Sequence, residues 1–147
     1  MAAHPPPDPL TREVVDLIGA VVARYHAEYD EAAARFGLTG AQARVLAVLA
    51  RDPTPMRGLA HQLRCEPSNV TGILDRLEAR GLAERRPDPS DRRVKVASAT
   101  ELGLRTAARL RGSLDFAREP LAGLSVAQRS ALRDLLRRML ESPSSER

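Results

Sequence analysis

A change of hydrophobic period in the middle of the chain constrains the fold most. Over residues 38–81, apolar side chains recur at steps of three and four, which is typical of amphipathic helices. Over residues 82–99 the step shortens to two, which indicates strands with alternating faces. The middle of the chain is therefore expected to form helices first and a β-hairpin afterwards.

Turn and capping residues divide the helical part into three. Thr39 and Gln42 have the capping-box spacing, in which each side chain accepts a hydrogen bond from a backbone N–H at the helix start. The Asp-Pro-Thr-Pro run at 52–55 ends this helix, because proline cannot continue the helical hydrogen-bond ladder. A short helix follows, and then a third that begins at Pro67 and ends at Gly81.

Two strands are expected, at 82–86 and 94–99, because the residues between them are rich in proline, aspartate and serine. The second strand alternates, with Val94 and Val96 on one face and Lys95 and Ala97 on the other. Three short helices followed by a hairpin form a winged helix-turn-helix, which here spans residues 38–99. In that arrangement the last helix before the hairpin enters the major groove of DNA, and the hairpin, or wing, reaches the flanking backbone or minor groove.

Amphipathic segments lie on both sides of this region. Apolar residues form one helical stripe from Leu10 to Tyr29, and Gly37 follows at a position that a helix C-terminus favours. Thr100 is a good N-cap for a fifth helix, and residues 125–128 form a second capping box before the last helix. These helices carry more apolar surface than one small winged domain can cover.

Composition limits the class of protein. The chain has 147 residues, of which 43% are hydrophobic and 29% charged, as in one ordinary globular domain. No apolar run approaches the roughly 20 residues that span a bilayer, and the proline-rich start lacks the apolar core of a signal peptide. A single cysteine, Cys65, cannot form an intrachain disulfide. We therefore expect no membrane partner and a cytoplasmic location.

The third helix of the winged region has the side chains that DNA recognition needs. Its apolar residues, Val70, Ile73, Leu74 and Leu77, leave the opposite face to Ser68, Asn69, Thr71, Gly72, Asp75 and Arg76. An asparagine can pair bidentately with adenine, and a threonine methyl can contact thymine. Gly72 leaves this face uncrowded, and Arg76 is placed for a phosphate. The start of a solvated helix has the same residue types, so this face alone does not distinguish a DNA-binding helix from a solvated one.

The hairpin adds an electrostatic argument. Over the eleven residues 85–95, five cations, Arg85, Arg86, Arg92, Arg93 and Lys95, oppose two carboxylates, Asp88 and Asp91. This local excess of three positive charges compares with a net charge of +4 for the whole chain. A basic hairpin beside a polar helix favours duplex DNA as the partner over a merely solvated hairpin.

Other classes of function find less support. The three histidines are scattered, and the sequence contains no Cys/His metal spacing, phosphate-binding glycine loop or serine nucleophile motif. We therefore expect neither an enzyme nor a metal or other cofactor. A winged helix used for protein–protein contact remains an alternative, although it would not require an arginine-rich wing.

Two motifs resemble the MarR family of transcription regulators. Residues 67–82 (Pro-Ser-Asn-Val-Thr-Gly-Ile-Leu-Asp-Arg-Leu-Glu-Ala-Arg-Gly-Leu) resemble that family's recognition helix and its exit. Residues 88–94 and 98–103 resemble its wing and the start of its fifth helix. The resemblance implies a homodimer, joined through the first, fifth and sixth helices, that binds a pseudo-palindromic double-stranded DNA operator and is by family default a repressor.

The expected fold is mainly α with a small β-hairpin wing (α+β), in which N- and C-terminal dimerisation helices flank a winged helix-turn-helix. The expected segments are a disordered arm (1–9), dimerisation helix 1 (10–37), the DNA-binding region (38–99), dimerisation helices 5 and 6 (100–141) and a polar tail (142–147), all in one compact domain.

The resemblance also implies roles for wing residues. Asp91 and Arg93 match the family's Asp-x-Arg pair, in which the acid orients an arginine that enters the minor groove. Arg92 could take that role or contact phosphate, and Lys95 is a further candidate for DNA contact. Glu66 departs from the family, because it is a poorer helix cap than the Ser, Asp or Asn usual at this turn.

Members of the family are typically released from DNA by small, often aromatic or anionic effectors. Tyr25, His26 and Tyr29 are candidates for such a pocket, although we favour core or interface tyrosines and a solvated histidine. A redox-responsive regulator acting through Cys65 is a further alternative. Cys65 lies in the turn before the recognition helix, where a small apolar side chain also packs well.

Overall fold

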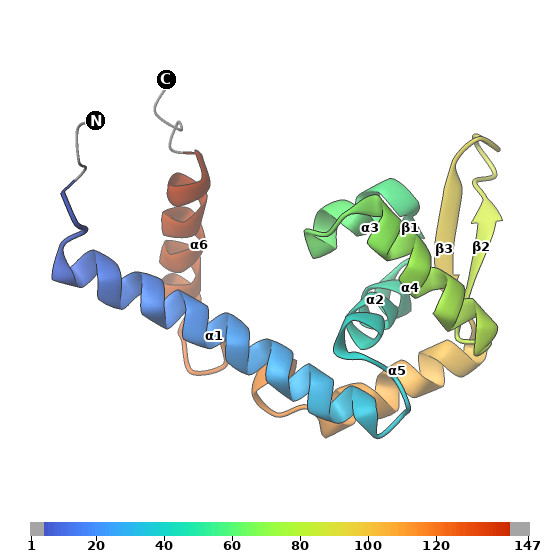
Figure 1. Cartoon of the computed structure of the whole chain (residues 1–147), viewed down its shortest axis with the longest axis horizontal. Coiled ribbons are helices and arrows are strands. Elements are labelled where there is room, and N and C mark those ends of the chain that lie inside the picture. Colours follow the sequence, from blue (N-terminus) through green and yellow to red (C-terminus); the bar gives the residue numbers. More distant parts are fainter. Residues whose placement is uncertain (1–4, 142–147) are drawn as a thin grey trace.

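The computed structural model describes residues 5–141 (Figure 1). Its elements, in chain order, are α1 (Pro9–Ala34), α2 (Gly40–Arg51), β1 (Thr54–Pro55), α3 (Met56–Leu63), α4 (Pro67–Ala79), β2 (Ala83–Pro87), β3 (Lys95–Ala99), α5 (Glu101–Ser113), the 3₁₀ helix η1 (Phe116–Arg118) and α6 (Val126–Glu141). This is the mainly helical fold with a small wing that the sequence predicts. The predicted tail at 142–147, and the first four residues of the predicted arm, lie outside the described residues.

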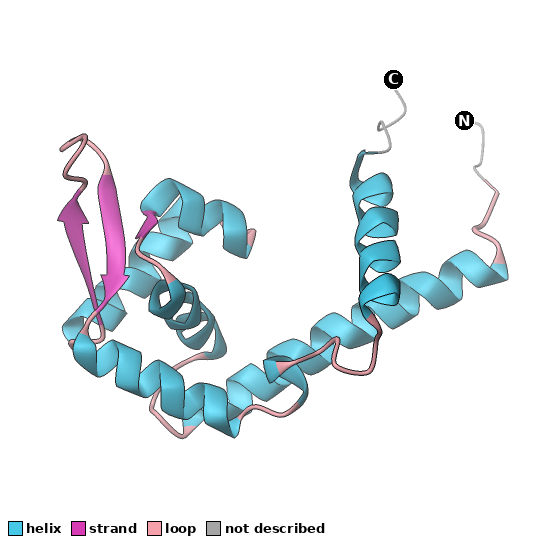
Figure 2. Cartoon of the chain, turned by 180° about the vertical axis from the view of Figure 1, so that it is seen from behind, coloured by secondary structure: helices cyan, strands magenta, loops and turns pink. Residues whose placement is uncertain are grey.

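Figure 1 shows how the helices are arranged. The first half of α1 and α6 lie on one side of the molecule, and the winged region formed by α2, α3, α4 and the strands lies on the other. The last turns of α1 and the helix α5 join the two sides at the base. Seen from behind in Figure 2, the β2–β3 hairpin stands at the outer edge of the winged region. Within the described residues, none of the helices is long and apolar enough to cross a membrane.

One cluster of buried apolar side chains holds the winged region together. Leu46 of α2, Leu59 of α3, and Leu74 and Leu77 of α4 are completely buried within it. Leu110 brings α5 into the same cluster. These residues lie at the helical spacing that the sequence shows, because burial of one apolar stripe per helix is what stabilises such helices.

The sheet differs from the predicted two-stranded hairpin. It has three antiparallel strands in the order β1-β3-β2. The additional strand β1 pairs Thr54 with Ala97 and Pro55 with Val96. In the sequence this segment reads only as a helix terminator, because a two-residue strand that contains proline has no local signature. Proline is nevertheless compatible with an edge strand. On β3 it is Ala97, not the larger Val96, that is completely buried.

The predicted helix caps are present. Thr39 and Gln42 form a reciprocal capping box, and Thr100 Oγ1 accepts a hydrogen bond from the Gly103 N–H. A cap that the sequence analysis missed lies in the predicted arm, where Asp8 accepts from the Thr11 N–H at 3.0 Å. Helix α1 consequently begins at Pro9 and ends at Ala34, before the turn at 35–37.

Helix α1 also holds the connection between α5 and α6. The Glu28 carboxylate accepts hydrogen bonds from the backbone N–H groups of Asp115 and Ala117, at the start of η1. The Arg24 guanidinium lies 4.2 Å from the centre of the Phe116 ring, a cation–π contact. These contacts fix the route by which the chain returns along α1.

The apolar stripes of the two terminal helices are exposed. Leu10 and Leu140 are 67% and 72% exposed, and α6 contains no buried residue. The exposed apolar residues of the two helices are Leu10, Val14, Val15, Leu17, Ile18, Val21 and Val22 on α1, and Val126, Leu135, Leu136, Met139 and Leu140 on α6. A contiguous apolar surface of this kind marks an interaction site on a folded protein.

Gly103 provides a test of the packing between α5 and Leu82, the residue that precedes β2. A Cβ at this position would overlap the backbone carbonyl oxygen of Leu82, which also accepts a hydrogen bond from the Thr100 N–H. We expect Gly103→Ala to lower the free energy of unfolding by about 1–3 kcal/mol, because backbone cannot move aside cheaply. Denaturant unfolding at fixed protein concentration measures this.

Gly112→Ala in the same helix is the matched control. A Cβ there meets nothing within 4 Å, so we expect it to be stabilising by about 0.5–1 kcal/mol through helix propensity. Equal effects of the two substitutions would contradict the close approach of α5 to Leu82.

Candidate nucleic-acid interface

Helix α4 presents one apolar and one polar face. Val70, Leu74 and Leu77 are completely buried, and Ile73 is half-buried. The residues predicted for the opposite face are all exposed: Ser68, Asn69, Thr71, Gly72, Asp75 and Arg76. The two faces of the helix are therefore divided as the sequence predicts.

The polar face of α4 is open. A Cβ built on Gly72 would meet nothing within 4 Å, so the fold itself does not require glycine there. The Thr71 hydroxyl donates to the Pro67 carbonyl oxygen at 3.1 Å, which engages its proton within the helix. Glu66 occupies the N-cap position without a side-chain hydrogen bond, as expected of a poor cap.

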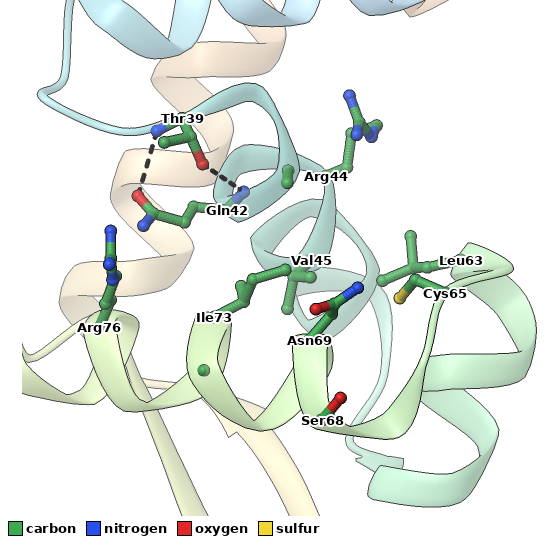
Figure 3. A pocket seen from close by; sticks show the side chains of 12 residues that line it. Thr39, Gln42, Arg44, Val45, Leu63, Cys65, Ser68, Asn69, Ile73 and Arg76 are labelled. Atoms are coloured by element: carbon green, nitrogen blue, oxygen red, sulfur yellow. Dashed lines mark hydrogen bonds between the residues drawn. The ribbon is translucent and has the colours of Figure 1, made fainter.

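A half-open cavity of about 430 Å³ lies between α4 and α2 (Figure 3). Asn69 and Ile73 point from α4 toward α2 across it. Its lining includes two arginines, Arg44 and Arg76, and no carboxylate. Arg44 was not singled out from the sequence, because a lone cation on a helix gives no sign of what lies opposite it.

Hydrogen bonds shape the tip of the wing between β2 and β3. Asp88 Oδ1 accepts from the N–H and the hydroxyl of Ser90 at 2.8 and 2.7 Å, and these bonds, the hydroxyl first, lower the pKa of Asp88. The Asp88 N–H donates to the Val94 carbonyl, and the Val94 N–H donates to the Asp91 carbonyl. The tip is thus a defined turn and not a loose loop.

The Asp-x-Arg pair of the wing is in contact. Asp91 Oδ1 accepts from the backbone N–H of Arg93 at 3.1 Å and from its Nε at 3.2 Å. The guanidinium also donates from Nη2 to Asp91 Oδ2 at 3.4 Å, and the Arg93 side chain is nevertheless 91% exposed. Arg92 and Lys95 are exposed beside it, and within residues 5–141 neither forms an ion pair.

Not every cation of the hairpin is available to a partner. Arg85 donates to both carboxylate oxygens of Glu78, at 2.9 and 2.8 Å, and to Asp75 at 2.5 Å. Arg86 donates to Glu84 at 3.1 Å. Arg86 stays exposed like the cations of the tip, so Arg85 is the cation of the hairpin that its contacts withdraw from solvent.

The residues suggested for effector or redox roles lie apart from this surface or beneath it. Tyr29 is buried, and burial is the main cause that raises its pKa to about 12. Its ring centre lies 5.1 Å from that of the half-buried Tyr25, whereas His26 is exposed. Cys65 is a half-buried free thiol that packs against the core and lines the cavity between α2 and α4.

No group of three or more His, Cys, Asp or Glu side chains in residues 5–141 is arranged to hold a metal ion.

Fold and surface together define a winged helix-turn-helix protein, and comparison with known proteins identifies the family. A model of the MarR family matches residues 36–94. The HTH-type transcriptional repressor NicR of Pseudomonas putida is 32% identical over 142 residues, which cover 92% of this chain and 87% of that protein. The chain therefore belongs to the MarR family of transcriptional regulators.

Solved structures share the fold over nearly the whole chain. A MarR-family transcriptional regulator from Rhodococcus sp. RHA1 is 26% identical, with a TM-score of 0.71, and the match covers 93% of this chain and all of that one. A mutant MarR from E. coli complexed with operator DNA is 23% identical, with a TM-score of 0.67 over 91% of this chain and 99% of that one. At 23% identity, the likeness to the operator-bound structure shows a shared fold only.

The contact between Arg85 and Glu78 predicts a pH dependence of stability. Hydrogen bonds from Arg85 lower the pKa of Glu78 below its usual value of 4.5. The charged contact therefore stabilises the fold fully above pH 4.5 and is lost as the pH falls through the folded-state pKa. We expect Glu78→Gln to unfold at a lower temperature than wild type at pH 7, with a gap that shrinks below pH 4.5. Thermal unfolding over a pH series measures the gap, and a constant gap would contradict the assignment.

Proposed function

We propose that this chain is a transcriptional repressor that binds a pseudo-palindromic operator as a homodimer in the cytoplasm. The observation that carries the proposal is the pairing of an open polar face on α4 with an exposed basic tip on the wing. Two copies related by a twofold axis would present two recognition helices to successive turns of the major groove.

On α4, each polar side chain has a distinct role in the proposal. Asn69 reads adenine through its amide, and Thr71 offers its methyl to thymine because its hydroxyl is already engaged with Pro67. Ser68 contacts base or phosphate near the helix start, and Gly72 lets the helix approach closely. Arg76 binds a phosphate and fixes the register.

On the wing, Arg93 enters the minor groove. Its contact with Asp91 supports this role, because an arginine whose guanidinium is already oriented loses less freedom on binding. Arg92 and Lys95 contact the flanking phosphates. The negative potential of a narrow minor groove favours an inserted guanidinium.

Operator binding is tested with a duplex selected by the wild-type protein from a random-sequence pool. Gel-shift titrations with nonspecific competitor, at two salt concentrations, measure the affinity. We expect Arg92→Ala/Arg93→Ala to weaken binding about a hundredfold or more, and to lower the salt dependence, because two phosphate or groove contacts are lost per subunit.

Arg35→Ala/Arg105→Ala is the charge-matched control, because both side chains are exposed and lie outside α4 and the wing, Arg35 directly after α1 and Arg105 on α5. Wild-type affinity is expected for it. If the wing variant binds the operator as tightly as this control, the wing assignment is wrong, and a winged helix used for protein contact becomes the better interpretation.

The homodimer is supported by the exposed apolar stripes of α1 and α6, which a second copy of the chain would cover. Leu17→Glu/Leu135→Glu places charges on both stripes, and we expect it to sediment as a monomer and to lose operator binding. Ala23→Glu on the opposite side of α1 is the control and should remain dimeric. A dimeric Leu17→Glu/Leu135→Glu variant would contradict the interface.

Release by a small aromatic or anionic effector completes the proposal. Tyr25 offers an aromatic face, and the charges of Arg111 and Arg44 act on the neighbouring Tyr29 phenol, although burial has the larger effect on its pKa. An aromatic ring and positive charges that act on the neighbouring phenol suit an aromatic carboxylate. Benzoate and its hydroxylated derivatives are the probes to titrate against the operator complex, and Arg111→Ala should blunt the response.

A further inference from the structure

Three charged side chains join the recognition helix to the wing. Arg85, on β2, donates from Nε and Nη2 to the two carboxylate oxygens of Glu78. The same Nη2 donates to Asp75 Oδ1. Asp75 and Glu78 are three residues apart on α4 and lie on one side of it, so one guanidinium reaches both. These three residues form what we term the Arg85 cluster.

The strand register directs Arg85 toward α4. Arg85 is the partner of Ala97 in the β2–β3 ladder, and directly opposite residues point to the same face of a sheet. Ala97 is completely buried, and its small side chain leaves room for the long arginine stem beside it. Only 24% of the Arg85 side chain is exposed, in contrast to the 91% of Arg93 at the wing tip.

The acids of the cluster lie where negative charge would oppose the proposed function. Asp75 is 59% exposed, directly precedes Arg76 and belongs to the polar face of α4. A carboxylate within about 8 Å of a phosphate is only partly screened at physiological salt. The hydrogen bonds of the cluster lower the pKa of Glu78 and raise that of Arg85, so both stay charged at neutral pH. The cluster then carries one negative charge instead of two.

We propose that Arg85 assists DNA binding without contacting DNA itself. It offsets the charge of Asp75 and Glu78 beside the recognition face, so that these carboxylates repel the phosphates less. The inference rests on the proposed function. It reverses the role that a basic hairpin suggests for this arginine, which is direct contact with a phosphate.

Variants that remove the charge of Arg85 alone, or together with those of Asp75 and Glu78, distinguish charge masking from direct phosphate contact. We expect Arg85→Met to weaken binding to the selected operator about tenfold, the order expected for one unmasked charge near a phosphate. The triple variant Arg85→Met/Asp75→Asn/Glu78→Gln should return to within about threefold of wild type. Its salt dependence should equal that of wild type, because no phosphate contact has been lost.

A direct phosphate contact gives the opposite pattern. The triple variant would then bind as weakly as Arg85→Met, and the slope of log affinity against log salt would fall by about one for each subunit. That result would overturn the proposal. Circular dichroism and sedimentation of each variant establish that it is folded and has the oligomeric state of wild type.

A second variant keeps the proposal testable if Arg85→Met does not fold. Asp75→Asn/Glu78→Gln retains Arg85 and removes both acids, and we expect it to bind DNA as tightly as wild type or more tightly. Weaker binding would overturn the masking role. If wild type selects no operator, the proposed function fails and this role with it. If wild type binds and Arg85→Met binds equally well, only the role of Arg85 fails.

Discussion

The packing of α4 onto the helices behind it determines the rest of the interface. Val70, Leu74 and Leu77 are completely buried in one cluster with Leu46 and Leu59. Each fully buried side chain of this size contributes about 1.5–3 kcal/mol. A rotation of α4 by one residue, about 100°, would expose this apolar face and bury polar side chains. The core therefore sets which side chains α4 presents.

Features with a local cause were predictable from the sequence. The faces of α4 follow from helical spacing, and the box formed by Thr39 and Gln42 follows from the hydrogen-bonding needs of a helix start. Strand β1 was not predictable, because its two residues become a strand only through their pairing with β3. The completely buried position of Ala97 was missed for a related reason. Hydrophobicity ranks valine above alanine, but Ala97 lies on the central strand, between its partners Thr54 and Arg85, on the face of the sheet that is covered.

The terminal helices mark a second limit of prediction. Their apolar stripes are clear in the sequence. A single chain does not cover them, since α6 buries no residue in the monomer, so the surface that covers them cannot be predicted from one chain. By contrast, the way α1 holds η1 through Glu28 and Arg24 is internal to the chain but has no sequence signature. Contacts between residues nearly ninety positions apart depend on the complete path of the chain.

Charge shows most clearly why composition and structure can disagree about function. In the sequence, the five cations of the hairpin are equivalent, and each adds to an attraction for DNA. In the structure, Arg93 faces solvent while Arg85 turns inward to two acids of α4. The electrostatic field outside the protein depends on which charges lie close together, since a paired cation contributes little beyond the screening length. A count of arginines thus gives the number of cations that could contact DNA, and the strand register determines which of them face solvent.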